Sequence, residues 1–379
     1  MYNISAYGKM IADVPRIEAY VSALRHAIKP DSVVVDLGCG PGFFAILACR
    51  LGARRVFAIE PSNVLQVGRD AAREYGFSDR IEFIQDFSTN VTLPEQADVI
   101  VSDLRGVLPL FQQSLTSIID ARTRFLRPGG ILIPQADRLW AAVVEAPVRY
   151  ADIVSPWENN ANGVVLNSAR NLVVNLWAKG RVHPENLLGQ PVVWAELNYR
   201  QLEEVNVCRN LSLPVARQGT AHGLSVWFDA ELIDGVGFSN APGDAELIYG
   251  QGFFPFQQPL AVAAGDQINV RLEARLIKDD YVWRWDTALV SEGKIKSCFK
   301  QSTLFGAPLS VAQLHKHAGP YVPKINEEGA VTRFVLSKMD GGNSNEQIAA
   351  ALATDFSSRF RNQTEALDFV ADMSDKYSG

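Results

Sequence analysis

The sequence predicts an α/β protein, in which a parallel-sheet half precedes an antiparallel β-barrel-like domain and a small C-terminal helical domain. Three observations carry this prediction. Short apolar runs rich in β-branched residues alternate with helical patterns as far as residue 133, which is typical of repeated βαβ units. From about Ala141, apolar residues alternate with polar ones, as in antiparallel strands with one buried face. Residues 326–379 again carry helical spacing.

The first half is expected to hold a parallel sheet with its crossover helices. Val33, Val34 and Val35 form a short apolar run that suits a buried strand. In chain order, the predicted elements are helix 15–28, strand 33–35, helix 43–51, strand 55–60, helix 64–75, strands 81–84 and 99–101, helix 114–125 and strand 131–133. Residues 1–138 are therefore the first expected domain.

Two further domains are expected after it. Runs such as VVWAELNY, LSVWFDAELI and INVRLEARLI alternate apolar and polar residues between closely spaced Pro and Gly. This pattern favours a sandwich or barrel over residues 139–310, with a less regular excursion at 155–189. Residues 320–379 form the third domain, in which Ile348, Leu352, Phe356 and Phe360 keep i+4 spacing.

Composition and charge narrow the function classes. The 379-residue chain has a formal net charge of −6, which argues against nucleic acid as a partner because the phosphate backbone favours a basic face. No apolar run approaches the ~20 residues that span a bilayer, and the N-terminus lacks the apolar region of a secretory signal. We therefore expect a cytoplasmic protein without a membrane partner. The four cysteines show no metal-ligand spacing, so no metal site is expected.

The most informative stretch is the turn after the first strand, Asp36-Leu-Gly-Cys-Gly-Pro-Gly42. Its glycines let the backbone approach a ligand, and the following helix N-terminus offers free N–H groups. A dinucleotide site also fits such a turn, and a tight turn without any ligand is a further alternative. Asp36 argues against a diphosphate, which its charge repels, and favours a ligand that carries an ammonium group.

Polar residues also follow the next three predicted strands, at the edge where open α/β sheets bind their ligands. Glu60 is placed to accept hydrogen bonds from ribose hydroxyls, although a nicotinamide enzyme has an acid there too. The loop 86–88 suits an adenine ring, or is a plain solvated loop. Asp103 can position or deprotonate a reacting group, or it caps a helix.

The chain resembles the protein arginine methyltransferases, in a divergent bacterial form, from about residue 2 to residue 290. Its segment MIADVPRIEAY, from Met10 to Tyr20, matches the family's M-x-x-D-x-x-R-x-x-x-Y helix. LGARRVFAIEPS resembles the family's second-strand signature, and LRPGGILIP resembles the end of its Rossmann-like half. The resemblance implies a class I methyltransferase that uses S-adenosyl-L-methionine as donor and releases S-adenosyl-L-homocysteine.

The resemblance also implies roles for individual residues on the donor side. Arg16 is expected to pair with the donor's carboxylate, a task that suits a guanidinium. Met10 is expected near the sulfonium, with Tyr7 in the same lid. The full set expected around the donor is Tyr7, Met10, Arg16, Asp36, Gly38, Cys39, Gly40, Glu60, Pro61, Asp86, Phe87, Ser88 and Asp103.

The resemblance continues, less completely, into the second half. HGLSVWFDAEL, from His222 to Leu232, is similar to the start of a strand pair in the family's β-barrel. The segment PWEN, from Pro156 to Asn159, resembles the arm through which members of the family dimerise. A homodimer is therefore expected.

The acceptor side departs from the family, in which two glutamates on a hairpin grip the guanidinium. Alignment places Asp103 and Gln112 at these two positions, and they are the expected catalytic residues. Tyr249 is expected to line the acceptor pocket, in a stretch that replaces the family's Thr-His-Trp. The expected acceptor is a peptide or protein side chain, and a neutral Gln suits an amide, hydroxyl or amine at least as well as a guanidinium. A small-molecule N- or O-methyltransferase and a non-catalytic scaffold are the alternatives.

The C-terminal segment has a weaker resemblance of its own. Residues 326–356 are similar to the helical half of small winged-helix proteins that carry precursor peptides in pyrroloquinoline quinone biosynthesis. Related domains recognise leader peptides, so a peptide is one expected ligand. A small helical cap packed on the barrel is the alternative.

Overall fold

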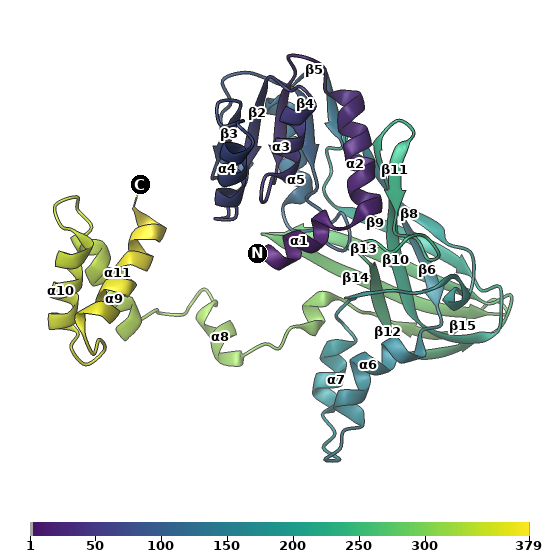
Figure 1. The fold of residues 1–379 in the computed structure, drawn as a ribbon. Helices are drawn as coiled ribbons and strands as arrows, with labels where there is room; N and C mark the ends of the chain where they lie inside the picture. The colour runs from purple at the N-terminus through teal and green to yellow at the C-terminus, as the bar shows by residue number, and fades with distance from the viewer. Residues whose placement is uncertain (1–2, 379) are drawn as a thin grey trace. The chain divides into compact units, whose positions relative to one another are not determined.

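The structure is a computed structural model that describes residues 3–378. The chain divides into two compact units, of which the first ends at Pro308 and the second begins at Leu309. The first unit holds a five-stranded parallel sheet and two antiparallel sheets (Figure 1). The second unit is helical. Among the described residues, none of the helices has the length and apolar character needed to cross a bilayer.

The parallel sheet has the strand order β3-β2-β1-β4-β5, and all four pairings are parallel. Its strands are β1 (Val33–Leu37), β2 (Arg55–Ile59), β3 (Ile81–Ile84), β4 (Ala97–Ser102) and β5 (Leu126–Ile133). The predicted strand 131–133 is too short, because β5 already begins at Leu126. A register shift opposite β4 and a positive φ of 75° at Gly129 let residues 126–130, which precede the predicted strand, join it.

Successive residues of these strands enter two different cores. Val34, Val56 and Val99 pack with helices on one face, whereas Val35 and Phe57 belong to a core that continues into the antiparallel sheets. The helices of this half are α1 (Ile4–Ile11), α2 (Val14–Ala27), α3 (Phe43–Arg50), α4 (Leu65–Glu74) and α5 (Ser114–Arg124). Because strand side chains alternate between faces, the parallel sheet can bury both faces and so couple the two halves of the unit.

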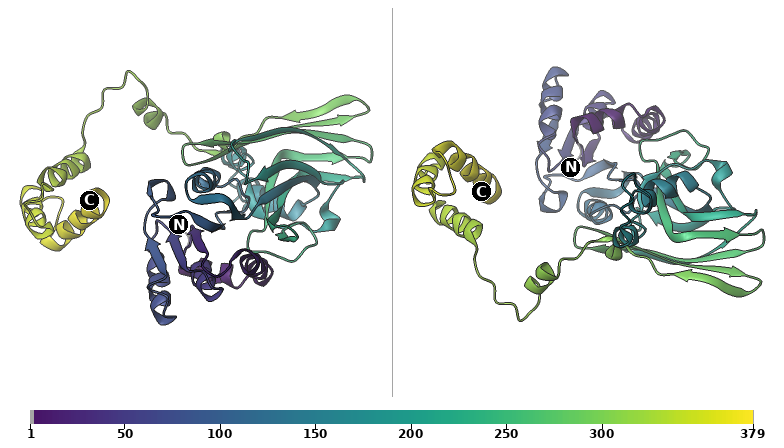
Figure 2. Two further views of the ribbon diagram at one scale, coloured as in Figure 1. Left: turned by 90° about the horizontal axis from the view of Figure 1, so that it is seen from above. Right: turned by 90° about the horizontal axis from the view of Figure 1, so that it is seen from below.

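The second half of the unit consists of the two antiparallel sheets, which face each other in Figure 2. One has the order β7-β12-β10-β6-β8 with β11 paired to β10, and the other has the order β15-β14-β13-β9. Their strands are β6 (Ala136–Val144), β7 (Ala178–Gly180), β8 (Val192–Asn198), β9 (Val207–Pro214), β10 (Gly219–Ile233), β11 (Val236–Ser239), β12 (Gln251–Val262), β13 (Gln267–Ile277), β14 (Asp280–Ser291) and β15 (Lys294–Phe299). The change to antiparallel pairing thus occurs at Ala136, slightly before the predicted residue 141.

The irregular segment predicted at 155–189 is a helical excursion from this half. The excursion begins earlier than predicted, with α6 (Pro147–Glu158), and continues through α7 (Asn167–Val173) to the short strand β7, which returns the chain to the sheet beside β12. Several apolar side chains of the excursion are exposed, among them Val148 at 74% and Val164 at 55%. The excursion therefore offers apolar surface outside the core of the unit.

The second unit contains α8 (Val311–Lys316), α9 (Glu327–Lys338), α10 (Asn345–Asp355) and α11 (Gln363–Tyr377). The last three pack around a core of their own, which includes Val331, Val335, Leu352 and Val370. Ser344 caps α10 in a capping box with Gln347. No strand occurs among residues 309–378, and the resemblance to peptide-carrying proteins stays a prediction.

Candidate functional site

The candidate site lies at the carboxyl ends of three neighbouring strands of the parallel sheet. Asp36 lies in β1, Glu60 directly follows β2, and Asp103 directly follows β4. Since the sheet order is β2-β1-β4, these three acids lie at one edge of the sheet. Ligands of open α/β folds bind at this edge.

The glycine turn packs closely against helix α1. The N–H groups of Gly38 and Cys39 donate to the carbonyl of Ile59, at 2.9 and 3.1 Å, which holds the turn against the end of β2. Gly40 has a φ of 51°, and a Cβ added there lies 2.6 Å from Cε1 of Tyr7. Glycine is therefore required at this position both by the backbone conformation and by the close approach of Tyr7.

Glu60 is buried with its carboxylate turned toward the glycine turn. Oε2 accepts a hydrogen bond from the N–H of Gly40 at 3.2 Å, and Oε1 accepts one from the N–H of Ser62 at 3.0 Å. Each carboxylate oxygen can accept a second hydrogen bond. The geometry therefore leaves capacity for two donors, such as a pair of ribose hydroxyls.

Asp36 is buried, and its Oδ2 has no hydrogen-bond partner among the described residues. The pKa of this carboxyl group is raised to about 7, because burial and the nearby Glu60 outweigh a backbone hydrogen bond from Ala45 that lowers it. An unpartnered buried carboxylate oxygen is costly unless a ligand binds it. A cationic ligand group satisfies this requirement.

The loop after β3 presents an aromatic ring at the same edge. Asp86 Oδ1 accepts hydrogen bonds from the N–H of Phe87 at 2.7 Å and from Asn90 Nδ2 at 2.8 Å, so this acid orders the short helix η1 (Ser88–Asn90). The ring of Phe87 is 65% exposed, while Ser88 is buried. Phe87 is thus available to a flat ligand ring. The remaining donor-side candidates differ in exposure: Cys39 is buried, Met10 is partly buried and Pro61 is exposed.

Arg16 pairs with Asp103 in this structure. Its Nε donates to Asp103 Oδ2 at 2.7 Å, its Nη2 also binds that oxygen, and its Nη1 donates to the carbonyl of Met10 at 3.0 Å. Tyr249 completes the group, because its hydroxyl lies 2.7 Å from both oxygens of Asp103 and 2.9 Å from Arg16 Nε. The structure therefore brings together three residues that the sequence assigns to the site.

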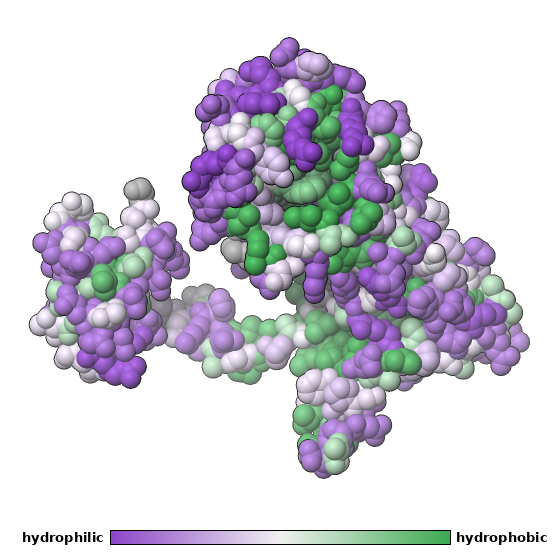
Figure 3. All heavy atoms as spheres, in the orientation of Figure 1, coloured by the Kyte–Doolittle hydropathy of each residue, from purple (hydrophilic) through white to green (hydrophobic). Residues whose placement is uncertain are grey.

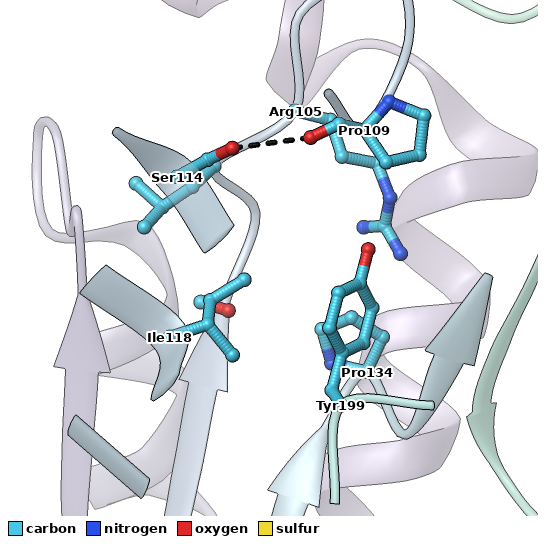
Figure 4. A pocket seen from close by; sticks show the side chains of 8 residues that line it. Arg105, Pro109, Ser114, Ile118, Pro134 and Tyr199 are labelled. Carbon is cyan, nitrogen blue, oxygen red and sulfur yellow. Dashed lines mark hydrogen bonds between the residues drawn. The ribbon is translucent and has the colours of Figure 1, made fainter. Parts of the chain in front are cut away.

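A second arginine contacts the same carboxylate from the interior. Arg105 Nη1 donates to Asp103 Oδ1 at 3.1 Å and to the hydroxyl of Tyr20 at 2.8 Å. The rest of its guanidinium forms a two-point pair with Asp137, at 3.0 and 2.7 Å, and Asp137 also accepts from the hydroxyl of Tyr199. Figure 4 shows Arg105 and Tyr199 beside a small cavity of about 10 Å³.

The two arginines fix the protonation state of Asp103. Burial alone favours the neutral acid, but Arg16 and Arg105, with the hydrogen bond from Tyr249, hold the pKa of Asp103 below its ordinary value. Asp103 is therefore ionised at neutral pH and is a weak base. It is suited to orient groups or to balance positive charge.

Gln112 lies elsewhere on the loop after β4 and is exposed. Its backbone has a φ of 44°, and its N–H donates to Asp280 Oδ1 at 3.3 Å. Its neighbour Gln113 binds the carbonyl of Lys278. The turn between β13 and β14 thus holds this part of the loop.

Four further residues belong to this group although the sequence did not predict them there: Tyr20, Arg105, Asp137 and Tyr199. Two signals were present in the sequence: Tyr20 ends the matched M-x-x-D-x-x-R-x-x-x-Y helix, and Arg105 follows Asp103 by two residues in the same loop. Residues 137 and 199 belong to the antiparallel half, and no spacing rule connects them with residue 105. Their contacts depend on how β6 and the segment after β8 pack against the loop.

Two protein families match this chain. Residues 34–130 match the family described as "Methyltransferase domain". Residues 135–288 match the family described as "Arginine methyltransferase oligomerization subdomain".

Curated relatives carry related names. The chain is 27% identical over 258 residues to the probable protein arginine N-methyltransferase 6 of Arabidopsis thaliana. The alignment covers 66% of this chain and 59% of the relative. It is 29% identical over 299 residues to protein arginine N-methyltransferase PRMT10 of Oryza sativa subsp. japonica, and this alignment covers 69% of this chain and 78% of the relative. The chain thus spans about 60% of the length of the Arabidopsis relative, and likewise of two rice proteins named 6.2.

Solved structures share the fold. The enzyme-prozyme complex of Trypanosoma brucei PRMT1 with AdoHcy superposes with a TM-score of 0.72 at 21% identity, over 78% of this chain and 96% of that one. Protein arginine methyltransferase 10 of Arabidopsis thaliana superposes with a TM-score of 0.69 at 22% identity, over 79% and 97%. The chain thus contains a methyltransferase domain followed by a subdomain of the arginine methyltransferase oligomerization type, and it shares the fold of these solved structures.

The glycine turn of this methyltransferase domain fits S-adenosylmethionine, the donor that such a domain implies. The unpartnered Oδ2 of Asp36 suits the donor's ammonium group, and Glu60 can accept from the ribose hydroxyls. The exposed ring of Phe87 suits the adenine. Arg16 is the residue expected to bind the donor's carboxylate, and its guanidinium has five N–H groups to share between that carboxylate and Asp103.

Affinity for the donor should depend on pH through Asp36. We expect binding of S-adenosylmethionine to weaken about tenfold from about pH 8 to about pH 6, because the fraction of ionised Asp36 falls by that factor around its pKa of about 7. Titration calorimetry of wild type, Asp36→Asn and the exposed control Asp79→Asn measures this. The pH dependence should vanish in Asp36→Asn alone, and its persistence there contradicts the assignment.

Stability should depend strongly on the pair of Arg105 and Asp137. Arg105→Leu leaves a buried carboxylate without its partner, so we expect the free energy of unfolding to fall by about 3–5 kcal/mol. The double variant Arg105→Leu/Asp137→Asn should recover part of this loss. Urea unfolding compares both with Arg138→Leu, which breaks an exposed pair with Glu196 and should cost at most about 1 kcal/mol. Equal losses in single and double variants argue against the pairing.

Proposed function

We propose that this protein transfers the methyl group of S-adenosylmethionine to a side chain of a peptide or protein. The observation that carries the proposal is the buried, unpartnered Oδ2 of Asp36 beside the carboxylate of Glu60, at the ligand-binding edge of the sheet. A turn without a ligand leaves the cost of this arrangement unexplained. The supporting comparisons are the methyltransferase domain and the relatives named as protein arginine methyltransferases.

The bound donor supplies a methyl group activated by its sulfonium, and the protein supplies orientation. In our proposal, Asp36, Glu60 and Arg16 fix the two charged ends and the ribose of the donor. Tyr7 lies over the glycine turn, where it covers the bound donor and helps to exclude water. Asp103 and Tyr249 then orient the acceptor group next to the donor.

We propose that the acceptor is an uncharged nitrogen or oxygen nucleophile rather than a guanidinium. A guanidinium needs free carboxylates, but both oxygens of Asp103 already bind arginines. At the position of the second family glutamate, Gln112 is neutral and exposed. Asp103 with Arg16 and Arg105 therefore lacks the net negative charge that attracts an arginine side chain.

The test of this function is a methylation assay on a panel of peptides. Each peptide offers one type of acceptor, either arginine, lysine, an amide or a hydroxyl, and mass spectrometry detects the added methyl group. We expect transfer to an amide or hydroxyl, and a rate about 10²-fold lower for Asp103→Asn. Preferred transfer to arginine contradicts the uncharged acceptor. If no peptide is methylated while calorimetry shows donor binding, the peptide acceptor itself is wrong.

We also propose that two copies of the chain form a dimer through the excursion of α6 and α7. The matched subdomain is described as an oligomerization subdomain, and Val165 and Leu166 of this excursion are 53% and 46% exposed. On the face drawn in Figure 3, hydrophobic residues gather over α3 and α1 between hydrophilic borders, which offers a surface to receive them. Apolar patches of this kind mark interaction sites.

Light scattering tests the dimer. Wild-type protein should show twice the mass of the chain, and Val165→Asp/Leu166→Asp should show the mass of one chain, because burying two carboxylates in an apolar interface is costly. Val322→Asp, at a side chain that is 84% exposed outside the excursion, is the control and should remain dimeric. A monomeric wild type rejects this proposal.

A further inference from the structure

A cavity of about 210 Å³ lies in the first unit, between the loop that follows Asp103 and the antiparallel half. Five residues between Gly106 and Phe111 form one side of it, and Trp177, Asp280, Tyr281 and Trp283 form the other. The cavity therefore adjoins the loop that carries the proposed acceptor-binding acid. None of the donor-side candidates lines it.

The aromatic walls of the cavity are fixed by the core. Trp283 and Tyr281 are only 2% and 6% exposed. Trp177 stacks on Phe254 with ring centres 5.5 Å apart, and it meets Trp283 edge-on at 5.7 Å. Rings that are packed in this way keep the cavity open without the entropic cost of ordering them when a ligand binds.

Asp280 provides the one charged side chain among the lining residues. Its Oδ1 accepts hydrogen bonds from the N–H of Tyr281 at 2.8 Å and from the N–H of Gln112 at 3.3 Å. Both bonds use the same oxygen, so the carboxylate is held in place while Oδ2 can accept from a ligand. The lining thus combines fixed aromatic rings with one negative charge.

This combination selects a cation on an apolar stem. Aromatic rings attract ammonium and guanidinium groups, and the methylene stem of Lys or Arg packs well on apolar walls while its charged end reaches a polar rim. The volume is sufficient for one such side chain, since a cavity of about 150 Å³ already holds benzene. A negatively charged ligand is disfavoured by Asp280.

We propose that the cavity is a subsite for a lysine or arginine side chain of the acceptor peptide, at a position near the methylated residue. The identity of the occupant rests on the proposed function. Gly106 follows Asp103 by three residues, so the two backbones are at most about 11 Å apart. An extended peptide covers about 3.3 Å per residue, which places the basic residue within roughly three or four positions of the acceptor.

The test uses the full chain and two probes that differ only in charge, N-acetyl-lysine N-methylamide and N-acetyl-norleucine N-methylamide. Binding is measured by tryptophan fluorescence and ligand-observed NMR, without donor and without methyl transfer. We expect saturable binding of the lysine probe, at least about fivefold tighter than that of the norleucine probe. Asp280→Asn should remove most of this difference, because the amide keeps the two backbone hydrogen bonds but lacks the charge.

Asp279→Asn is the matched control, since it removes a neighbouring exposed charge that does not line the cavity. The control should bind the lysine probe as tightly as wild type does. Trp177→Leu should weaken binding of the lysine probe, as Asp280→Asn does. Three results would contradict the proposed subsite: equal affinity for both probes, equal effects of the two aspartate variants, or no binding of the lysine probe. Because donor binding and methylation are measured separately, a failure here leaves the proposed function standing, and a failed methylation assay leaves the cation site standing.

Discussion

The carboxylate of Asp103 is the point at which the elements of the site meet. It binds Arg16 of α2, Arg105 of its own loop and Tyr249 of the segment between β11 and β12. All these groups are largely buried, where a lone charge costs several kcal/mol and a paired, hydrogen-bonded one is tolerated. Each member therefore needs the others, and helix α2, the parallel sheet and the antiparallel half are held in one arrangement. Asp13 adds a further link, because its Oδ2 accepts from the N–H of Ile248 at 2.6 Å.

This constraint explains why the residues proposed for the donor and those proposed for the acceptor belong to a single body. The core on one face of the parallel sheet continues without interruption into the antiparallel sheets. The ion pair of Arg105 and Asp137 also links the parallel-sheet half to the antiparallel half. Rigid placement of two reactants is the main contribution that an enzyme makes to methyl transfer. A site assembled from both halves is therefore as rigid as their shared core.

The fold was largely predictable from local patterns. Short apolar stretches identified β1 and β2, helical spacing identified α2 and α5, and alternation identified β8 and β13 close to their observed bounds. The errors lie at boundaries, where β5 begins at Leu126 and β6 at Ala136 rather than later in the chain. Strand pairing fixed these boundaries, since a segment with Pro and Gly joins a strand when its neighbour supplies the hydrogen bonds and a register shift absorbs the irregularity.

By itself, the sequence determined the α/β class, the glycine turn and the acids that end the strands, because these features follow from neighbours a few residues apart. Only the tertiary structure decided what those acids bind. Arg16 and Asp103 are 87 residues apart, Tyr249 and Asp103 are 146 apart, and Tyr199 and Asp137 are 62 apart. The cavity that holds Asp280 also joins distant segments. Such contacts arise from the packing of whole elements, which no local spacing encodes.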